Sequence, residues 1–470
     1  MRAVYWGKVA ASCGRRRRCR RSGTAKTDPV SDEDFRHASL LEGVRFTAQV
    51  AVPNVVQGLV RRRRSAGAVA AKTGADALAA RFMASLKRSY GEGPVWIRVA
   101  KDEALLLLGR EPIRHALMGS PDPFAADPEP KRSAMAKFQP HALTISRAEE
   151  WEDRRRFTEA VLDTGEPLHR LADRFAEACA QETARLAQRR ELTWEPFNTC
   201  MRRIARRVIL GDGAAEDDEL SEMLGELMDK ANPPGGGDQV LYERYTAALS
   251  TWVKAGAPAS LAGLIAGAPV TERTRPVDQV THWLFALGDT LAINAFRTLA
   301  VLAAFEPERE RVREELAGAE LTSAAGVAGL RFLEACLQEA MRLWPTTAML
   351  SRETVRDYEW NGASVPQGTQ LLIVNSFTHR DAAEFEFANR FAPEEWISGE
   401  AAQDWSFNHF SHGPQGCPGT GLALFVGKAV LGGLLSACEP RLLEPSLDPA
   451  KELPYALDFF TLRFELERRA

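Results

Sequence analysis

The chain has 470 residues, which is enough for about three domains or for one large one. Apolar residues make up 45% and charged residues 26%, so collagen-like, fully disordered and coiled-coil chains are excluded. Sixty basic and 63 acidic side chains nearly balance, which excludes a general nucleic-acid binder.

The first 74 residues differ from the rest in charge. They carry 16 basic and 5 acidic side chains, with the arginines concentrated in Arg15–Arg18 and Arg61–Arg64. Blocks of like charge repel one another and stay solvated. We therefore expect 1–74 to be a basic N-terminal extension that is partly disordered, through about residue 35. Its apolar stretch Phe46–Val60 is too short to span a bilayer and is expected to lie on an anionic membrane or against the body, with the arginines outward.

From residue 75 on, the pattern is mainly helical with a minor sheet, and no linker divides it. The segment 75–470 is therefore predicted to be a single domain, mainly α with a small β lobe. The expected helices are 75–90, a helical region over 149–255, and 277–305, 307–317, 329–343 and 420–438. The expected strands are 95–99, 104–108, 370–375 and 457–466, with a hairpin at 358–365 around Asn361-Gly362.

Neither the cysteines nor the apolar runs indicate secretion or a membrane span. Seven cysteines without a CxxC motif are typical of a reducing compartment, and no secretory signal precedes the arginines. The run Thr281–Phe305 is long enough to cross a membrane, but His282, Asp289 and Arg297 favour a helix in a protein core. We expect a cytoplasmic protein with no transmembrane anchor.

The sharpest local motif is Phe410-Ser-His-Gly413-Pro-Gln-Gly-Cys417-Pro-Gly419, at the start of the helix 420–438. Its glycines and prolines predict a tight loop, and the helix N-terminus favours a thiolate. The spacing F-x-x-G-x-x-x-C-x-G resembles the haem-binding loop of the cytochrome P-450 superfamily, the haem-thiolate monooxygenases. The resemblance implies that Cys417 is the metal ligand, that Phe410 packs beneath the haem, and that Gly413 and Gly419 shape the loop.

Other positions resemble the residues that hold haem in this family. Trp151 and Arg155 match W-x-x-x-R on a helix, and i, i+4 spacing puts both on one face. The resemblance implies that Arg155 binds one haem propionate and Arg352 another. Gln415 departs from the family pattern, which has Arg or His there, and the histidines of the loop are the candidates to replace that cation.

A structural triad is implied by two further motifs. Glu339-Ala-Met-Arg342 is followed by Leu-Trp-Pro, as in the family. Asn389-Arg390-Phe391-Ala-Pro-Glu resembles its meander motif. The resemblance implies that Glu339, Arg342 and Arg390 form a buried charge triad that braces the cysteine loop.

The catalytic residues are expected on the long helix. Ala286-Leu-Gly-Asp289-Thr290 resembles the family's A/G-G-x-D/E-T, with Leu287 in place of Gly. Reduction of dioxygen consumes two protons, which a hydroxyl and an acid behind it can hold and relay. The resemblance therefore assigns Asp289 and Thr290 as catalytic, while Leu287 puts the width of the oxygen groove in question.

The resemblance implies the cytochrome P-450 fold of a bacterial soluble type. Haem b (iron protoporphyrin IX) would lie between the long central helix (about 277–305) and the helix after the cysteine loop (about 420–438). The implied function is insertion of one oxygen atom of O₂ into a hydrophobic organic substrate. Two alternatives remain: an H₂O₂-driven peroxygenase, and a non-catalytic haem-binding protein.

Electrons are expected from outside the chain, which shows no flavin or iron–sulfur module. The expected partner is a ferredoxin- or flavodoxin-type electron donor with its reductase, and no nucleic acid. Such donors are acidic, so a basic face is expected, with Arg154, Arg156 and Lys428 as candidates. The expected walls of the pocket for a hydrophobic small-molecule substrate are 124–143, 228–240, 347–350 and 457–460.

Overall fold

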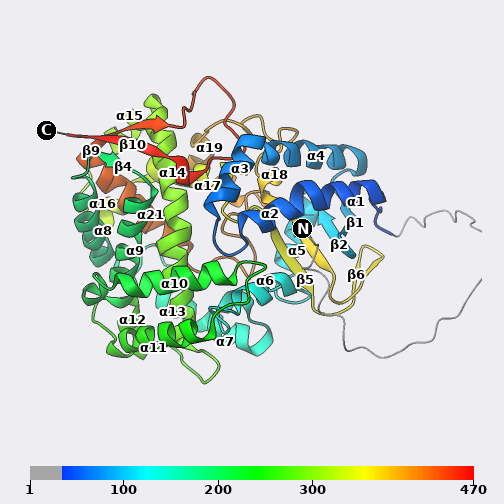
Figure 1. Ribbon diagram of the computed structural model, residues 1–470, viewed down its shortest axis with the longest axis horizontal. Coiled ribbons are helices and arrows are strands. Elements are labelled where there is room, and N and C mark those ends of the chain that lie inside the picture. Colours follow the sequence, from blue (N-terminus) through cyan, green and yellow to red (C-terminus); the bar gives the residue numbers. More distant parts are fainter. Residues whose placement is uncertain (1–33, 470) are drawn as a thin grey trace, which may run out of the picture.

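The computed structural model describes residues 34–469. A large helical body and a smaller lobe that contains the main sheet lie side by side (Figure 1). The α-helices are α1 Leu40–Phe46, α2 Val52–Gln57, α3 Arg64–Thr73, α4 Ala75–Tyr90, α5 Arg110–Met118, α6 Glu129–Met135, α7 Ala148–Leu162, α8 Ala172–Leu186, α9 Trp194–Leu210, α10 Asp218–Ala231, α11 Gln239–Ala255, α12 Leu261–Leu264, α13 Pro276–Phe285, α14 Leu291–Ala304, α15 Glu306–Leu316, α16 Ala324–Ala328, α17 Arg331–Leu343, α18 Asn375–Thr378, α19 Glu394–Ile397, α20 Glu400–Gln403 and α21 Thr420–Ala437.

Shorter π and 3-10 turns connect some of these helices. The π-helical turns are η1 Thr47–Ala51 and η5 Ala286–Thr290, and the 3-10 turns are η2 Leu143–Ile145, η3 Asp212–Ala214, η4 Ile265–Gly267 and η6 Phe459–Thr461. The strands are β1 Pro94–Val99, β2 Asp102–Leu107, β3 Phe124–Ala125, β4 Glu191–Leu192, β5 Leu350–Thr354, β6 Tyr358–Trp360, β7 Ala363–Val365, β8 Gln370–Ile373, β9 Cys438–Glu444 and β10 Arg463–Arg468.

The main sheet has the strand order β1-β2-β8-β5-β3. β1 and β2 pair antiparallel, as their short polar turn predicts, while β8 joins β2 in parallel and so brings the C-terminal half of the chain onto the N-terminal lobe. The expected hairpin is β6–β7, where Asn361 and Gly362 have φ of 52° and 89°. Positive φ at both turn residues is the geometry that Asn-Gly favours.

Residues 34–74, the described part of the predicted extension, pack against the lobe that contains the main sheet, so the domain boundary predicted at residue 74 is wrong. Phe46 is fully buried and Val50 is 2% exposed, packed in a cluster with residues of α4, β1 and β2. The backbone N–H of Trp96 donates to Arg36 O at 2.9 Å, which ties the segment to the edge of the sheet. The predicted disorder through about residue 35 falls almost wholly on residues outside the described range.

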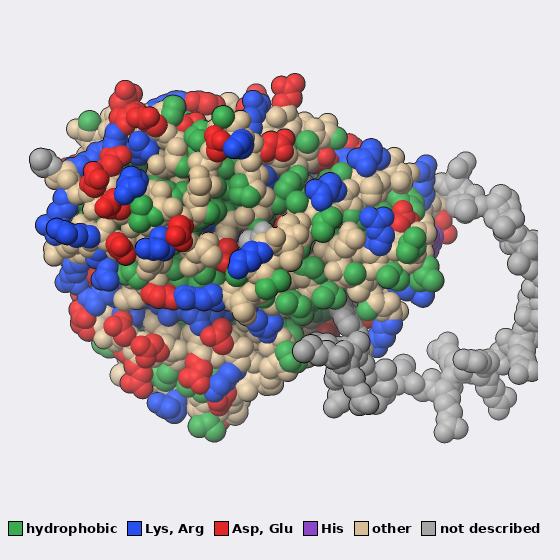
Figure 2. Space-filling view, turned by 45° about the horizontal axis from the view of Figure 1, so that its top comes forward, with side chains coloured by type: hydrophobic (Ala, Val, Ile, Leu, Met, Phe, Trp, Pro, Cys, Tyr) green, Lys and Arg blue, Asp and Glu red, His purple; other side chains and the backbone are tan. Residues whose placement is uncertain are grey.

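Three of the four arginines in Arg61–Arg64 bind other parts of the protein instead of pointing outward as expected, while Arg64 stays exposed and pairs with Glu195 at the surface. Arg61 pairs with Asp229 at 2.6 Å, Arg62 donates to Thr346 O at 3.1 Å, and Arg63 donates to Pro233 O. The outer side of this segment keeps an apolar surface, seen as green side chains on the right of Figure 2. Its exposed large apolar residues are Leu40, Leu41, Val44, Val52, Val56, Leu59 and Val69.

The long helix expected over 277–305 is one continuous helix made of α13, η5 and α14. It runs from Pro276 to Ala304, and it and α21 have the length and hydropathy of membrane spans. Within their most apolar stretches, 72% and 61% of the residues are buried inside the protein, respectively. Both helices therefore form the interior of this fold, as the polar residues of the first one predict.

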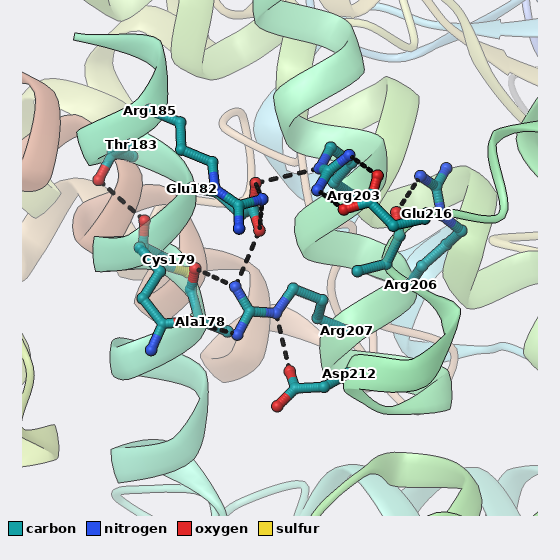
Figure 3. Close-up of polar contacts among 12 residues, drawn as sticks. Ala178, Cys179, Glu182, Thr183, Arg185, Arg203, Arg206, Arg207, Asp212 and Glu216 are labelled. Atoms are coloured by element: carbon teal, nitrogen blue, oxygen red, sulfur yellow. Dashed lines mark hydrogen bonds and ion pairs between the residues drawn. The ribbon is translucent and has the colours of Figure 1, made fainter. Parts of the chain in front are cut away.

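A charge network holds α9 against α8 (Figure 3). Glu182 on α8 is buried and accepts hydrogen bonds from Arg207 at 2.8 Å and Arg203 at 3.1 Å, both on α9. Arg207 also binds Asp212 at 2.8 Å. A buried carboxylate is tolerated when it is paired in this way. The network fixes α9, the helix that packs against the π turn of the long helix.

Candidate active site

A cavity of about 590 Å³ lies between the long helix, the start of α21 and the edge of the main sheet. This volume is in the usual range for a small-molecule site. Three of the four predicted walls line it, through residues in 124–143, 347–350 and 457–460. The fourth, 228–240, does not line the cavity, because its Asn232 instead binds the backbone N–H of Val60 at 2.9 Å.

The N-terminal segment supplies a wall that the sequence analysis did not assign. Val55, Leu59, Val60 and Arg62 are among the residues that line the cavity. The apolar run 46–60 indicated that this segment could be buried. The sequence does not show which side of the run faces a cavity. The segment read as an extension is therefore a component of the site.

The cysteine loop has the tight geometry that its glycines predict. Gly413 has φ +71°, and a Cβ there would lie 2.2 Å from the carbonyl oxygen of Leu117, so only glycine fits. The backbone N–H of Cys417 donates to Phe410 O at 2.9 Å. Phe410, Cys417 and Gly419 all line the cavity. A Cβ on Gly419 would meet only Leu162, at 3.5 Å, so this face is open.

Of the five cysteines that the structure describes, only Cys417 opens onto the cavity, and the other four are buried. The surrounding protein raises the pKa of the Cys417 thiol by burial, against the lowering effects of the Gly419 N–H, the Thr420 hydroxyl and Arg155. The predicted lowering by the loop is therefore present but outweighed. Binding of a metal ion deprotonates such a thiol.

Both expected haem-binding cations, Arg155 and Arg352, line the cavity, as does Trp151. Arg155 donates to Gly416 O at 2.5 Å and to Glu159 at 2.6 Å, so it holds the cysteine loop. Arg352 is 1% exposed and donates to the hydroxyl of Ser411 at 2.9 Å. Burial lowers the pKa of Arg352 to about 10.

Lys131, which the sequence analysis did not single out, is a third cation at this end. Its Nζ donates to Ala126 O at 2.9 Å and to Thr144 O at 2.8 Å. Burial, with the charge of Arg352, lowers the pKa of Lys131 to about 7. Gln415 accepts from the N–H of Ala126 at 2.9 Å, so it fixes the same loop as Lys131.

The loop histidines do not replace the missing cation at Gln415. Burial lowers the pKa of His409 to about 3, so this ring is neutral near pH 7. His412 binds Phe407 O at 3.0 Å and does not line the cavity.

These groups fit haem b. Within residues 34–469, neither Lys131 nor Arg352 forms an ion pair with a carboxylate, although both line the cavity. Buried cations that have only neutral hydrogen-bond partners are costly, and an anionic ligand would relieve that cost. The two propionates of haem supply such anions, while Cys417 offers the iron a sulfur ligand and Gly419 leaves space on the same side.

The predicted catalytic pair also faces the cavity, at the π turn η5. Asp289 and Thr290 line it, and Leu287 lies beside them and is 5% exposed. Asp289 is ion-paired with Arg202 of α9 at 2.6 Å, a partner that the sequence did not indicate. π turns are frequent at functional sites.

A neighbouring residue of α9 supports the opened backbone of this turn. Asn198 donates to Gly288 O at 2.7 Å. The charge network that fixes α9 therefore also fixes Asn198 and Arg202, which hold the turn from behind.

The predicted charge triad forms only in part. Glu339 and Arg342 are fully buried and paired at 2.6 Å. Arg390 contributes only its carbonyl oxygen, which accepts from Arg342 at 3.1 Å, and its side chain is exposed. The indole N–H of Trp396 donates to Glu339 at 2.9 Å, so Trp396 is the third side chain of this cluster in place of Arg390. The prediction for the Arg390 side chain was wrong, because a motif does not fix which group of a residue points inward.

Two of the three candidates for a basic partner face are also wrong. Arg154 is 3% exposed and donates to the hydroxyl of Ser146 at 2.6 Å. Lys428 is 4% exposed and pairs with Glu334 at 2.7 Å. Only Arg156, whose side chain is 65% exposed, is accessible. Arg154 lies in a run of charged residues that does not distinguish inner from outer positions. Lys428 lies in a helix that is apolar on all sides, so its burial could have been expected.

One cavity is lined both by a cysteine and by the opened turn of the long helix, and a cysteine in such a place suits a thiolate ligand to haem iron. Residues 276–456 match the cytochrome P450 family model. The fold is similar to that of a solved structure titled retinoic acid bound cyanobacterial CYP120A1, with a TM-score of 0.66 and 20% identity over 83% of this chain and 94% of that one.

Two curated relatives agree with this match. Cytochrome P450 4c3 of Drosophila melanogaster is 31% identical over 166 residues, which is 34% of this chain and 31% of that protein. The cytochrome P450 monooxygenase criE of Aspergillus cristatus is 36% identical over 145 residues, which is 29% of this chain and 26% of that protein. The matched part thus spans less than a third of each relative's length. Residues 276–456 are therefore similar to the cytochrome P450 family, and the fold of the chain is similar to that of the solved structure.

Proposed function

We propose that this protein is a haem-dependent monooxygenase that inserts one oxygen atom of O₂ into a hydrophobic organic substrate. The observation that carries the proposal is one cavity lined both by Cys417 and by the pair Asp289–Thr290. A thiolate ligand and a source of protons are the two requirements that this reaction places on the protein. The name of the fungal relative, a monooxygenase, supports the same reaction class.

Haem bound here would supply the activation of dioxygen, and the chain's own residues would prepare the site. Cys417 would hold the iron, while Arg352 and Lys131 would bind the propionates. Arg155, which was expected to bind one of them, is instead bound to Glu159 and to Gly416 O. The hydroxyl of Thr290 would hold a proton on the cavity side of the π turn. Asp289 would relay protons to it, and its ion pair with Arg202 sets where its carboxylate points. The apolar walls would exclude water from the reacting C–H bond.

The two alternatives differ in what they need from this site. A peroxygenase that uses H₂O₂ directly needs no relay of protons to dioxygen, so the Asp289–Thr290 pair favours the monooxygenase. A non-catalytic haem protein would be favoured by the departures at Gln415 and Leu287. Gln415 accepts a hydrogen bond from the N–H of Ala126, so it has a structural role in the loop. The departure at this position is therefore a weaker argument for a protein without catalytic activity.

The substrate, donor and location follow as parts of the same proposal. The structural neighbour, whose title says that it binds retinoic acid, supports a hydrophobic substrate. We expect a ferredoxin- or flavodoxin-type donor with its reductase, because the described residues contain no flavin or iron–sulfur module of their own. The cytoplasmic location and the bacterial type stay predictions; the two relatives above are from a fly and a fungus, and the structural neighbour is cyanobacterial.

The test begins with the iron ligand. The reduced CO complex of the wild-type protein should show the red-shifted Soret band of a thiolate ligand. Cys417→Ala should lose this band, and Cys438→Ala, a buried cysteine at the end of α21, should keep it. A Cys417→Ala protein with an unchanged spectrum would end the assignment.

The second step separates the reaction classes. Turnover of a hydrophobic substrate library is measured with a generic ferredoxin, its reductase and NADPH, and in parallel with H₂O₂ alone. Product that depends on NADPH and O₂ supports the monooxygenase. Product with H₂O₂ only, or no product from any haem-loaded preparation, supports one of the alternatives.

A further inference from the structure

Two arginines line the cavity away from the cysteine loop. Arg62 comes from the link between α2 and α3, and Arg297 comes from α14, two turns beyond the catalytic turn. Arg297 donates to Leu457 O and Trp344 O, both at 2.9 Å. Since a guanidinium carries five N–H donors, these bonds hold the group in place and leave donors for a ligand.

The carbonyl partners do not neutralise the charge of either arginine. Neither arginine forms an ion pair with a carboxylate in residues 34–469. The positive charge of Arg62 is one of the causes that lower the pKa of Arg297. Burial, the larger cause, lowers this pKa to about 9. The charges of Asp458 and Asp76 oppose this lowering at Arg297, and Asp76 also acts on Arg62, but neither aspartate forms an ion pair with these arginines or lines the cavity.

The same part of the long helix carries a second polar side chain, Asn294, with an atom that has no hydrogen-bond partner among the described residues. Asn294, one turn before Arg297, lines the cavity and is 6% exposed. One end of its amide donates to Thr290 O at 3.2 Å, and the other end has no partner among the described residues. The unpartnered end is the carbonyl oxygen Oδ1, which can accept a hydrogen bond from a water or a ligand hydroxyl but cannot bind an anion, so Asn294 is not part of the charged end of the cavity.

The surface around the arginines is apolar and aromatic. Phe459, Phe460 and Trp194 line the cavity beside Arg297, whose guanidinium carbon lies 5.6 Å from the centre of the Phe459 ring. Leu59 and Val60 continue this surface toward Arg62. A ligand that fits both parts has one anionic end and an apolar body.

We propose that Arg62 and Arg297 bind the carboxylate of the substrate, which is an amphipathic carboxylic acid. This inference rests on the proposed function, since it names the substrate class of the same cavity. The paired arginines would hold the acid end, and the apolar body would extend toward Thr290 and the cysteine loop. Planar guanidinium groups suit carboxylates because they can donate two parallel hydrogen bonds.

The experiment compares acids with their uncharged counterparts. The haem-loaded protein is titrated with hexadecanoic acid, all-trans retinoic acid and 4-phenylbutyric acid, and with the methyl ester of each, while the substrate-induced Soret shift is recorded. At least one acid should bind about tenfold to a hundredfold more tightly than its ester, as for a hydrogen bond to a buried charge. Arg62→Gln and Arg297→Gln should remove this preference and leave ester binding within about twofold of wild type.

Matched variants distinguish charge from folding. Arg63→Gln changes an arginine of the same segment that binds Pro233 O and does not line the cavity, so it should keep the acid preference. Arg297→Lys should keep part of it. If Arg297→Gln fails to retain haem, Arg62→Gln decides the question. Equal binding of acids and esters, no shift with any acid, or equal loss of both in Arg62→Gln overturns the proposal. A wild-type protein without the thiolate CO spectrum would instead overturn the proposed function.

Discussion

Replacing Gly413 by alanine tests the geometry of the cysteine loop. The residue has φ +71°, and its new Cβ would lie 2.2 Å from Leu117 O, whereas real Cβ contacts stay above 3.0 Å. The backbone conformation alone costs a residue other than glycine about 1–3 kcal/mol. The clash adds to this cost, because its partner is backbone of α5 and cannot rotate away. The loop must therefore shift, and Cys417 is four residues further along.

The expected result is weaker retention of haem. A cost of about 1.4 kcal/mol corresponds to a factor of ten in an equilibrium, so haem affinity should fall by about tenfold to a hundredfold. The assay is the rate of haem transfer to excess apomyoglobin, with the CO spectrum as a check on ligation. Thermal midpoints are less sensitive, since unfolding entropy scales with chain length and 1 kcal/mol moves a chain of 470 residues by about 1 °C.

The matched control is Gly421→Ala, in the first turn of α21. A Cβ there meets nothing within 4 Å, and alanine is the better helix former by about 0.5–1 kcal/mol. This variant should retain haem at least as well as wild type. If Gly413→Ala transfers haem at the wild-type rate, the argument from positive φ and the Leu117 contact is refuted.

Three further predictions concern proton supply, pH dependence and the N-terminal segment. Thr290→Ala should bind substrate within about twofold of wild type, but its reducing equivalents should form peroxide instead of product. Asp289→Asn should slow turnover by about 10²–10⁴-fold. If the coupling of NADPH oxidation to product is unchanged in both variants, the proton relay belongs to other residues. In the haem-free protein, burial lowers the pKa of Lys131 from 10.5 to about 7, so the unfolded chain binds more protons between these values, and the free energy of unfolding should rise with pH across that window. Urea titrations from pH 7 to 10 check this slope, which should be smaller in Lys131→Met. Deletion of residues 1–33 should leave the CO spectrum intact because, among the residues that the structure describes, the lining of the cavity begins at Ala51. Deletion of 1–72 removes Val60 and Arg62 and should abolish substrate binding; full binding by the longer deletion would contradict the cavity wall described above.

Much of the fold could be predicted from local patterns. The helix 75–90, the hairpin around Asn361-Gly362 and the helix beginning at 420 all depend on capping residues, turn residues or apolar runs within one short window. The cysteine loop was found in the same way, because its glycines, prolines and thiol are contiguous in the sequence.

What could not be predicted depends on contacts between distant parts of the chain. Arg202 meets Asp289 only because α9 crosses the long helix, and no spacing in the sequence indicates this. Lys131 is a candidate ligand for an anion because it is buried beside the cavity, and the polar sequence of its loop does not indicate that burial. The Arg61–Arg64 run was misread for a related reason: a block of like charge is normally solvated, but here each arginine finds its own partner on the body.

The N-terminal wall of the cavity has a consequence for how the protein acquires its shape. Val60 binds Asn232, which lies 172 residues later in the chain, and Arg62 binds Thr346, which lies 284 residues later. Pairings across such sequence separations form slowly, because the intervening chain must first be ordered. The segment that leaves the ribosome early must therefore wait until about three quarters of the chain has been synthesised. The cavity closes late in folding, which leaves an interval in which a large flat cofactor can enter before its wall is complete.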